Sequence, residues 1–512
     1  MSEIKWTDAP DGIAKTGGHL IPQTMRLDSG TMPYSVEGLS DAEQSIMRNL
    51  SEVWHDRYPS NELRSGYVTA KEQFKDFGIS IPGKIKQNAE AMIGWPAKAV
   101  RALADLSVFE GFALDGQPDT YGVRKMADDN MLDVVVSQLV SSCYTHGCAF
   151  MTVTTDPDDG HVVFQPRSAD WSAALWDTDK RRIKAALTIT SATKYGRVTG
   201  FDLWLPSRVI RCASDADGLG PFKAIRTCKT KYDGVAVVPF VYDPQLNRPF
   251  GRSRVTRSLM RLTDIGFRTI VRMEASAEFY AVPKLWFLGA DSDVFHADKW
   301  SSLVSSINAV SKDEDGDVPT MQQITQASMQ PHSDMLRTIA LLVSAETNLP
   351  VSDLGITMDN PASAEAMAVA ERKLTREADR QNRLFSRALR DAVGIGVCLK
   401  ESRATPPDEL DSLRVVWAPT QEISTTSRAD AFSKMAGVAP AFAQSEVGWR
   451  YAGFSQQDVD SIMASIRSQN AQNVLDRLTQ PQTGAAANEN DDGSRADSQT
   501  GDDPTEGNAL WG

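Results

Sequence analysis

"GRSRVTRSLMRLTDIGFRTIVRMEASAEFYAVP", residues 251–283, is the stretch that decides the fold. Its apolar residues recur with the period of an α-helix, and five arginines share that period in a neighbouring stripe. The arginines are Arg254, Arg257, Arg261, Arg268 and Arg272, with gaps of 3, 4, 7 and 4. Because Pro249 and Gly251 mark its start and Pro283 its end, the pattern predicts one helix about 45 Å long. A common globular helix has only about 11–12 residues.

The arginine stripe has two interpretations that the sequence leaves open. Long helices often carry a solvated basic face, whose arginines pair with acids such as Asp264 or Glu274 or with a neighbouring helix. Alternatively, several copies of the helix surround a polyanion, or pack against acidic faces of their own copies. The first interpretation predicts a structural role for the arginines, and the second predicts a functional one.

Composition narrows the class of protein. The chain has 512 residues, enough for several domains, with 41% hydrophobic and 24% charged residues, as in ordinary globular proteins. A net charge of −13 argues against a protein whose main task is to grip nucleic acid electrostatically. Five scattered cysteines indicate a reduced, cytosolic chain rather than a disulfide framework. No run of about 20 apolar residues predicts a membrane span, and the N-terminus lacks the pattern of a signal peptide.

The rest of the chain predicts an α+β fold. Residues 39–58 read as a helix, with Ser40 as the N-cap and Glu43 placed to complete a capping box. Apolar strands joined by tight turns follow, with helices between them, as far as the opening stretch. After it come a small β-α-β excursion, a returning helix from Pro331, and a loop rich in proline and glycine. A third, very long helix then spans about residues 360–395.

The segment "GISIPGKI", residues 78–85, has the G-x-x-x-x-G-K spacing of a phosphate-binding loop but lacks the residues that such a loop needs around that spacing. Ile85 stands where Ser or Thr would hold Mg²⁺, and the preceding residues are polar rather than an apolar strand. We therefore interpret the segment as a loop ahead of a helix.

No catalytic or metal-binding pattern emerges from the sequence. The six histidines are far apart, and none lies in an H-E-x-x-H or G-x-S-x-G context. Cys143 and Cys148 flank His146, but without a second Cys/His pair they indicate a structural role. The acidic segment "TTDPDDG", residues 154–160, is typical of a solvated turn. The sequence thus predicts no enzyme: no catalytic residue, no metal and no cofactor.

The order of these elements resembles the portal protein family of tailed bacteriophages, the head-tail connectors. Each local segment alone is weak evidence for this family, but the collinear order of the segments over roughly residues 50–465 is specific for it. The segments that carry the resemblance are "GWPAKAVRALADLSVFEGFAL" (94–114), "CYTHGCAFMTVTTD" (143–156), "ALWDTDKRRIKAALTI" (174–189), "VVPFVYDPQLNRPFGRSRVTRSLMRLTD" (237–264) and "VVWAPTQEISTTSRADAFSKMAG" (415–437).

The resemblance implies a portal-type subunit that assembles into a ring of about twelve copies through heterologous interfaces. Its parts would be a mixed α/β wing, long stem helices, a small β-α-β clip and a helical crown. The implied boundaries are an N-terminal arm (1–38), wing (39–250), stem helix (251–283), clip (284–329), second stem helix (330–348), tunnel loop (349–362), long wing helix and strand (363–425), crown (426–475) and a disordered acidic tail (476–512).

The family also implies partners and candidate sites. The ring would stand at the portal vertex of the capsid in the virion, after assembly in the host cytoplasm, with double-stranded DNA packaged and later ejected through its channel. The partners implied are the terminase large subunit, which is the separate packaging motor, the major capsid and scaffolding proteins, and the head-completion or adaptor proteins. The candidate residues are the tunnel-loop Asp353, Thr357, Met358, Asp359 and Asn360, the five stem arginines, and the clip acids Asp313, Glu314, Asp315 and Asp317.

A conduit must not bind its cargo tightly, because each phosphate contact adds affinity and slows sliding. An acidic chain suits that need, and residues 351–362 contain no Lys or Arg. The stem arginines would then face DNA, a neighbour's acids or outer solvent. Three other functions stay open at this point: another minor virion or head-assembly protein, an enzyme acting on nucleic acid, and a cytoplasmic scaffold or adaptor.

Overall fold

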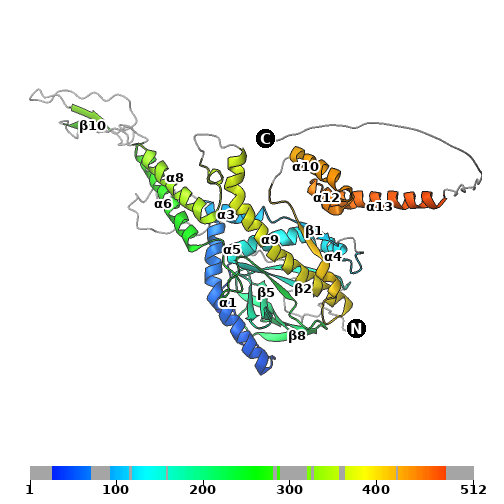
Figure 1. The fold of residues 1–512 in the computed structure, drawn as a ribbon. Coiled ribbons are helices and arrows are strands. Elements are labelled where there is room, and N and C mark those ends of the chain that lie inside the picture. Colours follow the sequence, from blue (N-terminus) through cyan, green and yellow to red (C-terminus); the bar gives the residue numbers. More distant parts are fainter. Residues whose placement is uncertain are drawn as a thin grey trace, which may run out of the picture. The chain divides into compact units, whose positions relative to one another are not determined.

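A computed structural model describes residues 26–70, 93–114, 118–156, 159–280, 285–288, 320–323, 328–356, 364–421 and 425–479. These residues mix helices and strands, and their contacts divide the chain into two units, residues 1–422 and 423–512 (Figure 1). The segment 78–85 and most of the predicted acidic tail lie outside the described residues. Within the described part, no helix is both long and apolar enough to cross a membrane.

A five-stranded antiparallel sheet forms one layer of the first unit, with its strands in sequence order. Helix α1 (Asp41–Val68) covers it, and the Trp54 indole donates a hydrogen bond to the Asp170 carbonyl at 3.0 Å. Buried apolar side chains of α1 and the sheet form a continuous core between them. The strands are β4 (Ser172–Asp177), β5 (Arg182–Ala192), β6 (Val198–Leu205), β7 (Arg208–Ala213) and β8 (Lys223–Lys229).

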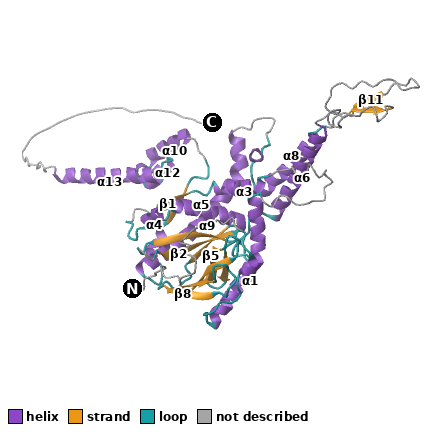
Figure 2. Cartoon of the chain, turned by 180° about the vertical axis from the view of Figure 1, so that it is seen from behind, coloured by secondary structure: helices purple, strands orange, loops and turns teal. Residues whose placement is uncertain are grey.

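A second, three-stranded sheet has the order β3-β2-β9, and both neighbours of β2 are antiparallel to it. Residues 149–153 of β2 are buried one after another, so both faces of this strand are covered. Helices α5 and α9 pack on it and share its core (Figure 2). The elements are β2 (Cys148–Thr155), β3 (Val162–Ser168), β9 (Val237–Val241), α5 (Leu132–His146) and α9 (Ala364–Glu401).

Shorter elements complete the body of this unit. Strand β1 pairs antiparallel with β12, so the last strand of the unit returns to its first. Helix α3 packs against α5. The bounds are η1 (Ser29–Thr31), α3 (Trp95–Ala104), β1 (Phe109–Ala113), α4 (Val123–Asp129), η4 (Asp408–Ser412) and β12 (Arg414–Trp417).

A helix pair follows β9. It consists of α6 (Arg257–Tyr280) and α8 (Gln330–Thr347), which lie side by side in Figures 1 and 2. The antiparallel strands β10 (Leu285–Leu288) and β11 (Thr320–Gln323) come between the two helices in sequence. A short 3-10 helix, η3 (Val351–Leu354), follows α8 and contacts it.

The second unit is helical. Its aromatic residues gather into one cluster, in which the ring centroids of Phe432 and Trp449 lie 5.2 Å apart and those of Trp449 and Phe454 lie 5.5 Å apart. The helices are α10 (Thr425–Val438), α11 (Pro440–Ala443), α12 (Glu446–Tyr451) and α13 (Gln456–Thr479).

Two of the helix boundaries that differ from the sequence prediction have a clear physical reason. The predicted capping box at Ser40 is present, since Glu43 accepts from the Ser40 backbone N–H at 2.9 Å, but α1 continues past Pro59 to residue 68. Proline removes only one helical hydrogen bond, and tertiary contacts hold the helix beyond it. Asn61 donates to the Ala169 carbonyl at 3.2 Å and Tyr67 to Asp264 at 2.6 Å.

The second difference is the start of the opening helix. The prediction that it begins at residue 251 is wrong, because α6 begins at Arg257 and is about 36 Å long. The backbone N–H groups just before α6 donate to carbonyls of other segments. Arg252 N–H donates to the Tyr242 carbonyl at 3.0 Å, and Arg254 N–H donates to the Tyr144 carbonyl at 2.9 Å. Thr256 Oγ1 then accepts from Leu259 N–H at 3.1 Å, as an N-cap does. Periodicity could not detect this, because the pattern of side chains runs through the break.

Gly251 sets the path of this connection. Its φ of +70° favours glycine, and a Cβ there would lie 2.0 Å from the Tyr242 carbonyl oxygen. We predict that Gly251→Ala lowers the free energy of unfolding by about 2–4 kcal/mol, from strain and the forced shift of backbone. Urea denaturation followed by circular dichroism measures it. The control is Gly160→Ala, at φ +74° with nothing within 4 Å, which should cost only about 1 kcal/mol. Equal losses would contradict the steric argument.

Candidate functional surface: the helix pair and the buried arginine at its base

The helices α6 and α8 are antiparallel, and polar contacts join them at both ends. At the base, Thr256, just before α6, donates to Glu346 near the end of α8 at 2.6 Å. At the other end, Ser276 of α6 lies 3.4 Å from the His332 ring nitrogen of α8. Between these contacts, buried apolar residues such as Leu259 and Val343 join the core of the body. The pair is therefore anchored at its base.

Helix α6 also packs tightly against the residues before α3. Phe267 and Val271 are buried together with Ile93, and Trp95 lies against them. A Cβ at Gly266 would come within 2.5 Å of the Trp95 ring, so only glycine allows this approach. One face of α6 is thus covered by the body of the unit and another by α8.

The arginines of the opening stretch have different environments. Arg254 precedes the helix and is buried, so the expectation that all five share one helical stripe is wrong for it. The other four project within about 60° of one another at about 100° per residue. Of these, Arg257, Arg261 and Arg272 are exposed, and Arg268 is half-buried. Arg261 lies 3.6 Å from the Asp264 carboxylate, which is the local pairing that the sequence suggested.

Arg254 is the centre of a junction between several elements. Its guanidinium is 5% exposed, and Nε donates to the Ala99 carbonyl of α3 at 2.7 Å. Nη2 donates to the Thr347 carbonyl at the end of α8, also at 2.7 Å. Nη1 forms an ion pair with Glu377 of α9 at 2.5 Å. A cation at the C-terminus of α8 also complements the helix dipole there.

The Glu377 carboxylate is itself held by further hydrogen bonds. It accepts from the Tyr242 hydroxyl, just after β9, and from the Asn348 amide at 3.3 Å. Burial raises the pKa of the Tyr242 phenol, so it stays protonated and donates to the carboxylate. The buried ions therefore have their main hydrogen-bonding needs met, which is the condition under which a buried ion pair is tolerated.

Basic residues of α9 border this junction. A hollow of about 540 Å³ is lined by Glu377 together with the exposed side chains of Lys373 and Arg376. Arg380, one turn further along α9, lies 3.8 Å from Asp243. These residues continue the charged faces that the sequence predicted for the third helix, and they place cations beside the base of the helix pair.

The segment after α8 is partly ordered as η3 rather than as one long loop. Asp353 in η3 pairs with Lys98 of α3 at 3.5 Å, and Leu349 is buried. The other predicted tunnel-loop residues, Thr357, Met358, Asp359 and Asn360, lie outside the described residues. The clip acids Asp313, Glu314, Asp315 and Asp317 do so as well.

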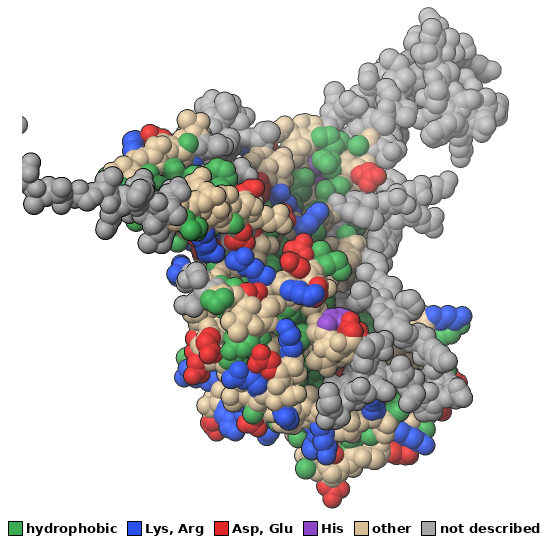
Figure 3. All heavy atoms as spheres, turned by 90° about the vertical axis from the view of Figure 1, so that its right-hand side faces the viewer, with side chains coloured by type: hydrophobic (Ala, Val, Ile, Leu, Met, Phe, Trp, Pro, Cys, Tyr) green, Lys and Arg blue, Asp and Glu red, His purple; other side chains and the backbone are tan. Residues whose placement is uncertain are grey.

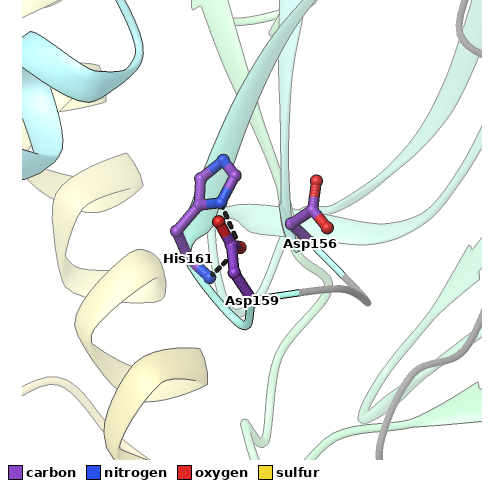
Figure 4. Close-up of side chains that lie close together, drawn as sticks. All are labelled: Asp156, Asp159 and His161. Carbon is purple, nitrogen blue, oxygen red and sulfur yellow. Dashed lines mark hydrogen bonds and ion pairs between the residues drawn. The ribbon is translucent and has the colours of Figure 1, made fainter.

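The acidic turn between β2 and β3 brings Asp156, Asp159 and His161 together (Figure 4). Asp159 accepts from the His161 backbone N–H at 3.0 Å and also bonds its ring, and these bonds lower the pKa of the carboxyl. Asp156 N–H donates to the His161 carbonyl at 2.8 Å, which closes the turn. Asp159 and His161 are exposed. The hydrogen bonds account for the cluster as a turn, as the sequence predicted.

Sequence reasoning missed the partners of Arg254. Glu377 is 123 positions away, and Ala99 and Thr347 contribute only backbone carbonyls. One signal was present: Glu377 lies beside Leu374 and Ala378, which belong to the apolar stripe of α9 and are buried. A carboxylate at the edge of a buried stripe is expected to pair with a cation, but the sequence does not identify that cation.

Comparison with known proteins gives consistent matches. A family model described as phage portal protein, SPP1 Gp6-like, matches residues 79–449. The chain is 25% identical to the portal protein of Mycobacterium phage D29 over 426 residues, covering 77% of this chain and 83% of that protein. It is 26% identical to the portal protein of Mycobacterium phage L5 over 428 residues, covering 79% and 85%.

Among solved structures, the neck of a native gene transfer agent (GTA) particle, computed with C12 symmetry, contains a similar chain. That match has a TM-score of 0.38 and 11% identity, and it covers 70% of this chain and 89% of the other.

The Arg254 junction makes a direct prediction about stability. Arg254→Gln should lower the free energy of unfolding by about 3–5 kcal/mol, because it leaves the Glu377 carboxylate buried without its cation. The matched control is Arg257→Gln, because Arg257 lies three positions further along the chain and is exposed. This variant should change the free energy of unfolding by less than about 0.5 kcal/mol. Urea unfolding compares the two.

A double variant separates the ion pair from the other contacts of Arg254. Replacing both partners, Arg254→Met with Glu377→Leu, should recover part of the loss, because no isolated charge stays buried. If Arg254→Gln lowered the free energy of unfolding no more than Arg257→Gln does, the junction would not hold these elements together.

Proposed function

The chain belongs to the phage portal protein family of the SPP1 Gp6-like type, and from this membership we propose that its copies form a closed ring around a DNA channel. In this proposal, double-stranded DNA is packaged inward through the channel and later leaves through it. The main support for the proposal is the family match over residues 79–449, because it spans the helix pair, the Arg254 junction and most of the body. Neither the family nor the relatives are named for a catalytic activity.

The exposed face of α8 supports assembly through the helix pair. Met335, Leu341 and Leu342 are 40%, 46% and 53% exposed on this helix. Exposed apolar groups gathered on one element are typical of a surface that another protein covers. A ring needs such a heterologous interface, in which a patch on one copy meets a different patch on the next. We propose that a neighbouring copy covers this face.

The charge distribution suits a conduit. On the face of the molecule drawn in Figure 3, lysine and arginine side chains alternate with acidic ones instead of forming one broad basic patch. With a net charge of −13, the chain has little general attraction for DNA. Since each neutralised phosphate adds affinity, few contacts favour movement of the cargo.

The finer assignments follow from the family resemblance and are part of the proposal. The ring would have about twelve subunits, as a closed heterologous assembly allows. Residues 251–283 and 330–348 would form the stem, 349–362 the tunnel loop facing DNA, and 426–475 the crown. Residues 284–329 would form the clip that docks the terminase large subunit and later the head-completion proteins. The capsid and scaffolding proteins would surround the ring at the portal vertex of the virion.

For the exposed arginines Arg257, Arg261 and Arg272 we propose a neighbour's acids as partners. The base of α6 is fixed by the Arg254 junction, so its exposed stripe has a set direction and can meet the same surface in every copy. Guanidinium groups form bidentate pairs with carboxylates, and this chain is rich in acids.

The first test of the proposed function is the shape of the purified protein. Negative-stain electron microscopy and mass photometry should show closed rings with a central hole and a mass many times 56.0 kDa. A stable monomer with metal-dependent nuclease activity would refute the proposal. If the protein purifies as an inactive monomer, co-expression with its capsid and scaffolding proteins supplies the conditions for ring closure. Absence of the protein from the resulting particles would then count against a portal.

The second test locates the arginine stripe. The triple variant of Arg257, Arg261 and Arg272 to Gln should weaken each interface about tenfold, if each lost pair is worth about 0.5 kcal/mol, and should therefore strongly lower the yield of closed rings. The control is Arg48→Gln, an exposed arginine on α1. Mass photometry measures ring yield, and phage complementation measures DNA packaging. Normal ring yield with defective packaging would place the stripe against DNA instead, and no effect on either would place it in solvent.

A further inference from the structure

A cavity among the described residues lies beside the base of the helix pair. It has a volume of about 870 Å³ and is walled by α1, by β4 and by the segment that connects β9 to α6. This volume lies in the range of sites for small molecules, about 300–1,000 Å³. All of its walls belong to the first unit.

The cavity is strongly basic. Five arginines line it against only two carboxylates, those of Asp56 and Glu346. Glu346 already accepts a hydrogen bond from Thr256, and Asp56 is exposed. The lining arginines are Arg57, Arg64, Arg248, Arg252 and Arg257.

Arg64 is the most enclosed of these cations. It donates to the His146 carbonyl at 3.0 Å and to the Asn61 side-chain oxygen at 3.1 Å, both neutral acceptors. Burial lowers the pKa of Arg64; Cys148 and Asp170 act against this, and the nearby cations Arg57 and Arg248 add to it. Arg57 and Arg248 therefore lie near enough to Arg64 to repel its charge, and an anion bound between them would relieve that repulsion.

Two buried polar groups in the wall lack a hydrogen-bonding partner in the described part of the chain. They are Nδ1 of His146, whose side chain is 5% exposed, and Oγ of Ser172, a residue that is 6% exposed. The opposite ring nitrogen of His146 lies 3.3 Å from Asp170. Neither atom is exposed to solvent, so neither serves as a contact for a ligand in the cavity.

The remaining wall is aromatic. Trp176 and Phe250 both line the cavity and pack edge to face, with ring centroids 5.8 Å apart. Rings of this kind offer a surface for a planar group, and the arginines offer donors for a charged one.

We propose that this cavity binds a small phosphate-bearing anion of nucleotide size. A phosphate concentrates about two negative charges and several acceptor oxygens in one group, so it can neutralise several converging guanidinium groups, which one carboxylate cannot. Its phosphates would contact Arg57, Arg64 and Arg248. The planar part would lie against Trp176. Duplex DNA, whose major groove alone is about 12 Å wide, does not enter a cavity of this volume.

The test is isothermal titration calorimetry of the purified full-length protein with two probes, inorganic pyrophosphate and adenosine triphosphate. We expect saturable binding of both with one site per chain, tighter for the nucleotide, and weaker as salt rises. Arg64→Gln should weaken binding about tenfold, the usual effect of losing one charge-assisted hydrogen bond. Arg248→Gln should do the same; its side chain is exposed, so this variant keeps the fold intact. Arg48→Gln, on the same helix as Arg64 but away from the cavity, should bind as the parent does.

Three results would overturn the proposal. The first is no binding of either probe at millimolar concentration. The second is binding that neither Arg64→Gln nor Arg248→Gln weakens, which would place the anion elsewhere. The third is competition: if a synthetic peptide of the acidic residues 480–512 displaces pyrophosphate and binds more tightly, the cavity is a peptide site instead. None of these results bears on whether the protein forms a ring.

Discussion

The buried guanidinium of Arg254 is the interaction on which the first unit depends. Its side chain bonds carbonyls of α3 and α8 and a carboxylate of α9, and its backbone N–H bonds a carbonyl of α5. A buried cation is costly to desolvate, so it is tolerated only when all of these partners are in place together. The group therefore couples elements that are remote in sequence, and it fixes the direction in which the helix pair leaves the body.

This coupling matters for a member of the portal family. A ring functions as a whole only if each copy presents the same surfaces at the same angles, and in the proposed ring the base of the helix pair would set that angle. Gly251 and the tight approach of Gly266 to Trp95 belong to the same arrangement, since both allow backbone to come close where a side chain would not fit. The exposed apolar side chains of α8 and the exposed arginines of α6 therefore lie on a helix pair that is anchored at its base.

Much of the secondary structure was predictable from the sequence. Runs of apolar residues predicted strands where β2, β3 and the β4–β5 pair lie, and Pro331 predicted the start of α8. The order of the elements led to the family resemblance, which the family match confirms. Three features were not predictable, for physical reasons. The stripe of arginines could not reveal that Arg254 lies before the helix, because its backbone bonds are tertiary. The helix predicted over residues 39–58 continues past Pro59, because contacts from Asn61 and Tyr67 keep it intact. Strand β8 was missed because its burial is mixed and its sequence polar.

In the proposed ring, the helix pair forms the stem around the central channel. A reconstruction of the assembled particle by electron cryo-microscopy tests it most directly, through the radial position of α6 and α8. Both helices should lie around the central channel, with the exposed leucines of α8 against a neighbouring copy. A ring in which this pair lies on the outer rim, with those leucines in solvent, would contradict it.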